Sequence, residues 1–555
     1  MDPYYDLGTH HRPITAATPD AQLWFDRGLI WIYGFNFDEA IACFKRALEH
    51  DPDCAMAYWG IAYAAGPDYN MPWSLYDDRG RAKALGIAYD AMEQAQKRAA
   101  PCTPAEQTLI AALSARYPQR TPTDGMDRWD HAFADAMRAA YALHPGDLDL
   151  VTIYVDSLLN LTPWQMWDLK SGTPAKGAAT PEAQSALETA MTQPGAMAHP
   201  GLLHLYVHLM EMSPTPEKAL KAGDVLRHLV PDAGHLVHMP THIDVLCGDY
   251  QNVVFWNQRA VEADLKYYNL EGAFNLYTGY RQHNYHFVIY GALFLGQFEP
   301  AMEAVRGMAD TTPEAMLRIK SPPMADFFES YVALEPHVLV RFGRWAEAKA
   351  LPVPDDPDLY RTLTANVHYA RAVAHAATGN VAQAEAEEIL FLAAKDRVPD
   401  TRLMHNNTVP DLLEIAREML RGEIEYRKGN YDTAFAHLRR SVALDDALPY
   451  DEPWGWMQPT RHALGALLFE QGHIAEAEVV YREDLGLGGQ LSRATVHPNN
   501  VWSLKGLHDC LKASHEPRDL PLIQQQLDIA MARADQAVAA SCFCAGAAMG
   551  DQKNA

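Results

Sequence analysis

The sequence predicts an all-α protein whose helices form hairpins that stack as an α-solenoid. The first observation is an alternation of large and small residues at helical spacing between positions 22 and 60. The second is a turn pattern headed by glycine, which recurs downstream at intervals of 36 to 50 residues. The third is that alternating β-type segments joined by Asn-Gly turns do not occur.

The first hairpin is predicted from the segment QLWFDRGLIWIYGFNFDEAIACFKRALEHDPDCAMAYWG, residues 22–60. Two antiparallel helices pack closely when small side chains on one face large side chains on the other. Here the small residues are Gly28, Ala40 and Ala47, and the large ones are Trp24, Trp31 and Phe44. Pro52 then ends the second helix. This is the pattern of a tetratricopeptide repeat, so we predict degenerate tetratricopeptide-like helical hairpins along the chain.

The later hairpins are predicted from short segments in which a glycine precedes a new amphipathic helix. A glycine at the end of a helix takes up a positive φ angle at low cost, and the next helix starts shortly after it. The segments are GDYQNV at 248, GQFEPA at 296, GRWAEA at 343, GNVAQA at 379, GNYDTA at 429 and GHIAEA at 472.

Proline-rich connectors divide this array. They cover residues 162–182, 352–358 and 445–456. We expect an N-terminal array over 1–195, a His-rich helical segment over 196–310, a C-terminal array over 311–540 and a tail over 541–555.

Composition excludes several partner classes. The formal net charge is −25, so the surface repels the phosphates of nucleic acid and of anionic membranes. The chain shows no secretory signal and no stretch of some eighteen uncharged apolar residues. Its seven cysteines are scattered and odd in number, which suits a reducing compartment. We therefore expect a cytoplasmic protein.

The strongest functional signal is a concentration of histidines between residues 199 and 286. His204, His208 and Glu211 stand at positions i, i+4 and i+7, so they share one face of a helix. The residues between them are apolar, which indicates a buried helix. Buried polar groups need partners, and two imidazoles four residues apart commonly bind one metal ion.

Two further histidine pairs follow at helical spacing. His238 and His242 flank Pro240, which is expected to kink the helix, and His235 lies a turn earlier on roughly the same face. His283 and His286 form the third pair. Two others are set aside, His199 as a helix start and His228 as a surface residue. The predicted metal ligands are His204, His208, His238, His242, His283 and His286.

Imidazole-rich sites favour zinc, copper, iron or nickel over magnesium or calcium. We expect zinc first, with copper or iron as alternatives. Glu211 is predicted to act as a ligand or as the general base beside a metal-bound water. Six histidines in two groups of three would instead suit a coupled copper pair. The pair Cys542 and Cys544 forms a short CxC motif that would suit a soft metal or a redox role, and the sequence does not say whether it reaches the histidines.

The chain resembles a group of bacterial tetratricopeptide-repeat proteins that largely lack an assigned function. The likeness is carried by residues 12–67 together with the segments HPGLLHLYVHLME, GHLVHMPTHI, HNYHF and ASCFC. It implies that His204, His208, His238 and His242 belong to a shared site. It brings no known reaction with it.

Three functions follow as hypotheses. The first is a metal-dependent enzyme that activates water to hydrolyse a small molecule. The second is a copper- or iron-dependent oxidoreductase at the same site. The third is a scaffold that binds a peptide or protein partner on its concave face, with structural histidines. Histidine and glutamate among apolar neighbours, as in residues 200–290, favour a metal site over a peptide groove.

Overall fold

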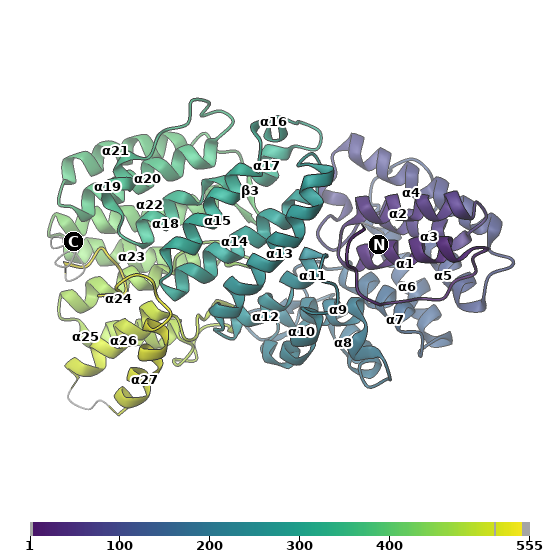
Figure 1. The fold of residues 1–555 in the computed structure, drawn as a ribbon. Coiled ribbons are helices and arrows are strands. Elements are labelled where there is room, and N and C mark those ends of the chain that lie inside the picture. Colours follow the sequence, from purple (N-terminus) through teal and green to yellow (C-terminus); the bar gives the residue numbers. More distant parts are fainter. Residues whose placement is uncertain (1–3, 515–517, 547–555) are drawn as a thin grey trace. The chain divides into compact units, whose positions relative to one another are not determined.

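The protein is described by a computed structural model that covers residues 4–514 and 518–546. Helices dominate these residues, and the strands are confined to two hairpins of two residues per strand (Figure 1). The predicted all-α class and the α-solenoid of helical hairpins are confirmed. Among the described helices, none is both long and apolar enough to cross a bilayer.

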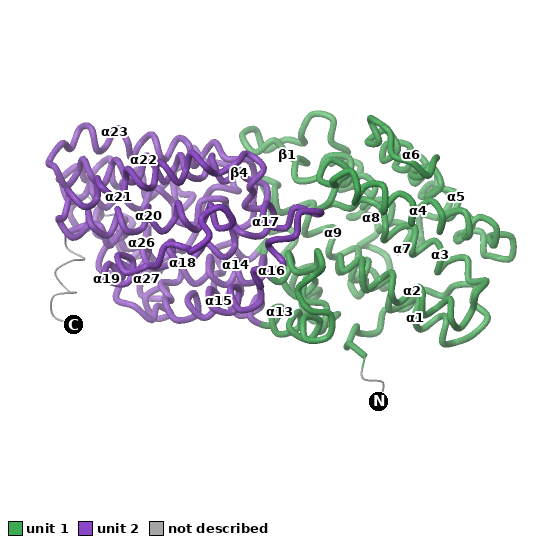
Figure 2. Tube along the Cα trace, turned by 90° about the horizontal axis from the view of Figure 1, so that it is seen from above, with its two compact units in different colours: residues 1–243, 259–281 green, residues 244–258, 282–555 purple. Residues whose placement is uncertain are grey.

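The chain divides into two compact units (Figure 2). Unit 1 comprises residues 1–243 and 259–281, and unit 2 comprises residues 244–258 and 282–555. These boundaries fall within the segment 196–310 that the sequence sets apart, and the three-part division stays a prediction. Of the predicted tail over 541–555, residues 547–555 lie outside the described part.

Unit 1 contains the N-terminal hairpins and most of the histidine-rich segment. Its helices are α1 (Pro19–Tyr33), α2 (Phe37–His50), α3 (Ala55–Ala64), η1 (Trp73–Leu75), α4 (Asp78–Arg98), α5 (Pro104–Ser114), α6 (Asp127–Leu143), α7 (Leu148–Leu159), α8 (Thr180–Ala190), η2 (Ala196–Ala198), α9 (Pro200–Glu211), η3 (Pro216–Ala219), α10 (Leu220–Leu226) and α11 (Gly234–His238). Strands β1 (Trp167–Asp168) and β2 (Thr173–Pro174) pair antiparallel. The unit boundaries fall inside α12 (Pro240–Leu246), α13 (Tyr250–Glu271) and α14 (Thr278–Leu295).

The first three helices interlock as the large and small residues predict. The ring of Phe44 on α2 fills the space beside Gly28 on α1 and Gly60 on α3. A Cβ atom at Gly28 would lie 2.6 Å from that ring, and one at Gly60 would lie 2.5 Å from it. Glycine is therefore required at both positions for the helices to approach. The side chains of Thr18 and Asn36 cap α1 and α2 by accepting backbone N–H groups.

Helix α9 carries the first histidine pair and is buried along its whole length. It starts where the sequence expects, because His199 occupies the N-cap and its Nδ1 accepts the backbone N–H of Leu202 at 3.2 Å. A Cβ at Gly201 would meet Thr152 and Tyr33 at 2.7 Å. This close approach packs the start of α9 against α1 and α7.

Helices α11 and α12 carry the second histidine group. Pro240 begins α12, so the helix breaks between His238 and His242 as predicted. A Cβ at Gly234 would lie 2.0 Å from Asp264 Oδ1 and 2.7 Å from the carbonyl oxygen of Ala260. Only glycine lets α11 begin this close to α13, and the following residue, His235, is thereby fixed in place.

Unit 2 is a run of further hairpins. Its helices are α15 (Phe298–Asp310), α16 (Glu314–Leu317), α17 (Met324–Phe328), η4 (Tyr331–Ala333), α18 (Glu335–Arg341), α19 (Trp345–Ala350), α20 (Arg361–Ala377), α21 (Val381–Lys395), α22 (Val409–Arg427), α23 (Tyr431–Asp445), α24 (Thr460–Glu470), α25 (Ile474–Asp484), η5 (Arg493–Thr495), α26 (Val501–Ala513) and α27 (Leu520–Met531). Strands β3 (Leu403–Met404) and β4 (Asn407–Thr408) pair antiparallel.

The glycine turns behave as the sequence predicts. All six have positive φ, between 62° and 82°, at Gly248, Gly296, Gly343, Gly379, Gly429 and Gly472. In every case a helix begins two residues later, at α13, α15, α19, α21, α23 and α25. The recurring pattern therefore marks real helix junctions.

Candidate metal centre

Three imidazoles converge inside unit 1. His204 and His208 come from α9, and His235 comes from α11. One ring nitrogen from each lies within 4.8 Å of the other two. The ring of His204 is 4.7 Å from that of His208 and 4.9 Å from that of His235, centroid to centroid. We call these three residues the histidine trio. All three are at most 2% exposed.

Two rings of the trio are oriented by hydrogen bonds at their Nδ1 atoms. His204 Nδ1 lies 2.7 Å from the backbone oxygen of Tyr33, and since that oxygen only accepts, Nδ1 carries the proton and donates. His208 Nδ1 lies 3.1 Å from Glu211 Oε1. Metal-binding histidines are oriented in this way, by a carbonyl or carboxylate on the ring nitrogen that does not bind the metal.

The other nitrogens of His204 and His235 are free to accept an ion. Within the described residues, His204 Nε2 and both ring nitrogens of His235 are buried without a hydrogen-bond partner. Burial, together with the neighbouring histidines, holds the pKa of His204 and of His235 well below the usual range. Both rings are therefore neutral at pH 7, the form that a metal ion requires.

A second pair of imidazoles lies beside the trio in unit 1. His238 Nε2 and His242 Nε2 are 2.8 Å apart, and the ring of His242 is 6.2 Å from that of His208. His242 Nδ1 lies 2.8 Å from Glu211 Oε2. Glu211 thus accepts from one histidine of the trio with one oxygen and from one histidine of the pair with the other. His242 donates through Nδ1, so in the neutral ring Nε2 accepts from His238.

Glu211 contacts the Nδ1 side of both His208 and His242. It is the last residue of α9 and is fully buried, and both of its oxygens are occupied by histidine Nδ1 atoms. These hydrogen bonds suit an orienting role, and the role of ligand or general base that the sequence suggests stays a prediction.

An aromatic shell surrounds the trio. Phe35 stacks on His208 and His235 with ring centroids 5.7 and 5.2 Å apart, and Tyr280 meets His235 at 4.6 Å. Tyr69 and Trp164 contact His208 at 4.6 and 5.9 Å. The shell excludes water and lowers the local polarity, which strengthens any charge interaction inside it.

Two of the shell residues have an unusual backbone. Phe35 has φ 55° and Trp164 has φ 59°, in the left-handed region that bulky side chains rarely adopt. Such conformations persist only where the surroundings enforce them, and they gather at functional sites. Both rings contact His208.

The third predicted pair lies in unit 2. His283 and His286 are on α14, and within unit 2 they contact His405 and Met457. His286 Nε2 is 2.8 Å from the sulfur of Met457, and the ring of His283 is 5.3 Å from that of His405. Burial lowers the pKa of His286 to about 3. Their membership of a metal site stays a prediction.

The CxC motif forms a disulfide between Cys542 and Cys544 in unit 2. The other five cysteines are free thiols. The redox role and the soft-metal role that the sequence leaves open both stay predictions.

Sequence reasoning missed one further buried cluster in unit 1. Asp149 Oδ1 lies 2.9 Å from His10 Nε2 and 3.0 Å from His199 Nε2, and it accepts the hydroxyl of Tyr33 at 2.6 Å. Arg12 donates to the other oxygen at 3.2 Å. Burial alone would raise the pKa of Asp149, but the hydrogen bonds from His10 and His199 bring it well below the usual range. Four donors therefore reach one carboxylate. We interpret this cluster as fixing the position of Tyr33, whose backbone carbonyl accepts the hydrogen bond from His204.

The comparisons with known proteins bear on the fold. The tetratricopeptide repeat model matches residues 21–54, which are α1, α2 and the turn after them. No curated protein matches the chain. Two solved structures align at 12% identity, the APC/C hetero-tetramer Cut9–Hcn1 and Naa15/Naa10 bound to HypK-THB.

The alignment with the first structure covers 93% of this chain and 94% of that one, with a TM-score of 0.25. The second covers 93% and 74%, with a TM-score of 0.21. At these TM-scores neither alignment establishes a shared arrangement of helices. The repeat itself rests on the matched residues and on the interlocked glycines and Phe44 described above. Residues 21–54 are therefore similar to a tetratricopeptide repeat.

Proposed function

We propose that the protein is a metal-dependent enzyme and that the histidine trio binds a transition metal ion. The observation that carries this proposal is the convergence of three buried ring nitrogens within 4.8 Å. Two supporting facts are the outward hydrogen bonds of His204 and His208, which leave the opposite ring edges for the ion. A set of neutral imidazoles suits zinc first and copper or iron next.

His204, His208 and His235 would hold the ion, and a zinc ion bound there would supply an activated water. An ion held this way lowers the pKa of the bound water to about 7 and makes hydroxide available near neutral pH. We propose hydrolysis of a small molecule as the reaction. The chain's own contribution is to hold the rings, to keep water out through the aromatic shell, and to fix the ring protons through Tyr33 and Glu211.

Metal content tests the proposal directly. Tag-free wild type should carry close to one ion per chain after purification or reconstitution with Zn, Cu, Fe, Mn and Ni, measured by inductively coupled plasma mass spectrometry. His204→Ala/His235→Ala should lose it. The matched control is His131→Ala/His228→Ala, which changes two exposed histidines of the same unit and should retain the ion.

The reaction is then tested on the ion that is found. Zinc-loaded wild type should hydrolyse members of a panel of esters and amides faster than either the metal-free protein or His204→Ala/His235→Ala. Equal rates in all three samples would refute hydrolysis while leaving the metal site intact.

The His238–His242 pair favours an oxidoreductase as the second candidate. Its two Nε2 atoms converge at 2.8 Å beside the trio, and Glu211 links the two groups. Two neighbouring groups of imidazoles are the kind of arrangement that holds a pair of copper ions. Two copper ions per wild-type chain, and one in His238→Ala/His242→Ala, would favour oxygen chemistry over hydrolysis.

A scaffold function is the third candidate, because the matched repeat is a common peptide-binding module. Absence of metal from wild type under every reconstitution condition would favour it, with a peptide or protein as the partner. A cytoplasmic location remains part of the proposal and rests on the cysteine content.

A further inference from the structure

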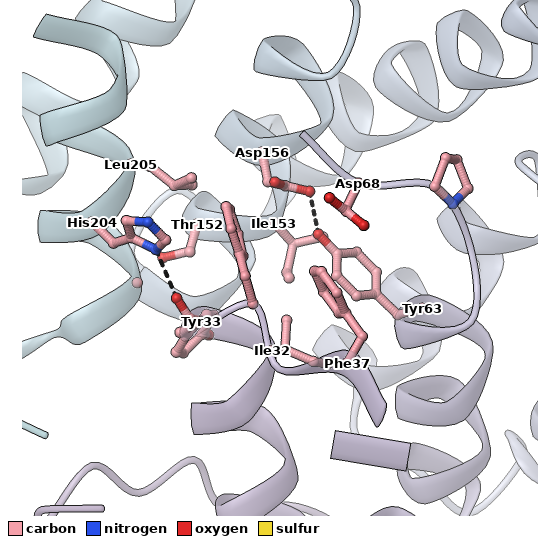
Figure 3. Close-up of a pocket in the computed structure, with 13 residues that line it drawn as sticks. Ile32, Tyr33, Phe37, Tyr63, Asp68, Thr152, Ile153, Asp156, His204 and Leu205 are labelled. Atoms are coloured by element: carbon pink, nitrogen blue, oxygen red, sulfur yellow. Dashed lines mark hydrogen bonds between the residues drawn. The ribbon is translucent and has the colours of Figure 1, made fainter. Parts of the chain in front are cut away.

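A small cavity opens beside α9 in unit 1, on the side of His204 that faces α1 and α7. It is lined by aromatic rings and by two carboxylates, and Figure 3 shows its wall. The aromatic residues are Tyr33, Phe35, Phe37 and Tyr63, and the acids are Asp68 and Asp156. The space open to the centre of a water molecule is about 20 Å³. A single group of the size of water or ammonium fits it.

Both acids line the cavity, and each has one oxygen engaged in hydrogen bonds. Asp68 Oδ1 accepts the backbone N–H groups of Asn70 and Met71 at 2.8 and 3.0 Å. Asp156 Oδ2 accepts from the hydroxyl of Tyr63 and from the side-chain amide of Asn160. Within the described residues, no hydrogen bond reaches Asp68 Oδ2 or Asp156 Oδ1. Asp156 is only 8% exposed, so its carboxylate is largely removed from water.

The surrounding side chains do not fully balance the negative charge of Asp68 and Asp156. The guanidinium of Arg116 acts on both carboxylates, but it is already ion-paired with Asp130 at 2.8 Å. Burial outweighs it and raises the pKa of Asp68 to about 7 and that of Asp156 above its usual range. A bound cation would supply the missing charge.

The acceptor groups that line the cavity favour a primary ammonium group over other organic cations. A primary ammonium group has three N–H donors, and the cavity offers three acceptors, namely the two carboxylate oxygens and the hydroxyl oxygen of Tyr63. Aromatic faces attract ammonium groups and also bury the alkyl carbons that follow them. A quaternary ammonium lacks the N–H donors, and a guanidinium head group is larger than the ammonium head group that the cavity fits.

We propose that this cavity is a binding site for the primary ammonium group of an alkylamine, held by Asp68, Asp156 and the Tyr63 hydroxyl. The ligand is a free amine or the side chain of a lysine, since both present the same group. The site does not rest on a metal at the histidine trio and is therefore tested on metal-free protein.

Isothermal titration calorimetry with n-butylammonium tests the site, with n-butanol and tetramethylammonium as ligand controls. We expect saturable binding of n-butylammonium, and binding of both controls weaker by about tenfold or more. Asp156→Asn and Asp68→Asn should each raise the Kd for n-butylammonium by about tenfold or more. Asp135→Asn is the matched control and should leave it unchanged, because that side chain is 76% exposed on α6.

Three outcomes would overturn the proposal. The first is the absence of saturable n-butylammonium binding to wild type, and the second is equal affinity for n-butylammonium and n-butanol. The third is an unchanged Kd in both variants when circular dichroism shows native helicity. Titration with Nα-acetyl-lysine methylamide separates the sources, since tighter binding of this compound than of n-butylammonium assigns the site to lysine, and weaker binding assigns it to free amines.

Discussion

Glu211 shows how much of the candidate site depends on a single side chain. Its two oxygens accept from His208 and His242, which belong to the trio and to the neighbouring pair. Because each oxygen fixes the proton of one ring on Nδ1, the carboxylate decides which nitrogen each ring presents to its other neighbours. No substitute of the same size offers two acceptors.

Glu211→Gln should weaken metal binding at the trio by about ten- to a hundredfold. The amide keeps one acceptor but places an NH₂ donor against a ring N–H, so one histidine loses its orientation. Competition with a chromophoric chelator measures the affinity. Glu217→Gln, at an exposed position of the following turn, is the control and should bind as wild type. Equal affinities in both variants would contradict the orienting role.

A second residue-scale prediction concerns Asp445 in unit 2. Burial, with Asp446 nearby, raises its pKa from 3.8 to about 6. The folded state therefore holds more protons than the unfolded state between about pH 4 and pH 6, and stability falls as pH rises through this window. The shift corresponds to about 3 kcal/mol at full burial.

Asp445→Asn removes this titration. Asparagine keeps an acceptor for Trp454 Nε1, which now donates at 3.0 Å. We expect the difference in free energy of unfolding, variant minus wild type, to be more favourable to the variant at pH 7 than at pH 4. Urea unfolding at the two values gives the difference, and the same difference at both would show that Asp445 does not titrate as stated.

At the scale of elements, the hairpins are set by glycines in two different roles. Gly28 and Gly60 make room for Phe44 between α1, α2 and α3. The six junction glycines instead supply positive φ angles, and several of them, such as Gly429, have no atom within 4 Å of an added Cβ. Substitution by alanine tests packing at the first kind of site and backbone conformation at the second.

Gly28→Ala should destabilise unit 1 by about 1–3 kcal/mol, since its Cβ overlaps the Phe44 ring. Phe44→Leu in the same chain should recover part of the loss, because the smaller side chain vacates the space. Gly146→Ala, where the nearest atom is 3.9 Å away, should change little. Thermal and urea unfolding provide the comparison, and an additive double variant would exclude the proposed overlap.

Gly429→Ala should cost about 1–2 kcal/mol through φ alone, since the residue has φ 81° and open space around it. Gly429→Asn should cost less, because asparagine tolerates the left-handed region. The free energies of unfolding of the two variants decide the matter. Equal losses would mean that the junction before α23 adjusts its backbone.

At the scale of the whole molecule, the sequence predicted the helical hairpins and the histidine pairs within one or two helical turns. It did not predict contacts between residues that are far apart in the chain. Helical spacing placed His204 with His208, and His238 with His242, because each pair lies within one or two helical turns. It could not find the carbonyl of Tyr33 behind His204, which is 171 residues away along the chain. Nor does any local signal mark the positive φ of Phe35, whose ring packs on the histidines.

Metal binding should stabilise unit 1 selectively. An ion at a hundred times its Kd adds about 2.7 kcal/mol to the folded state that binds it. We expect amide hydrogen exchange to slow in α9 and α11 on metal addition, while α25 and α26 of unit 2 keep their metal-free rates. Uniform slowing across both units, or none in α9, would contradict a site confined to the trio.

The turn between α1 and α2 belongs both to the matched repeat and to the candidate metal centre. Tyr33 holds His204 through its carbonyl, and Phe35, two residues later, stacks on His208 and His235. A partner bound to the first hairpin and an ion bound to the trio would therefore both favour particular backbone angles at Tyr33 and Phe35. Thermodynamic reciprocity then applies: whatever factor the ion applies to partner affinity, the partner applies to ion affinity. Partner binding and metal binding would in that case be energetically coupled through the turn between α1 and α2.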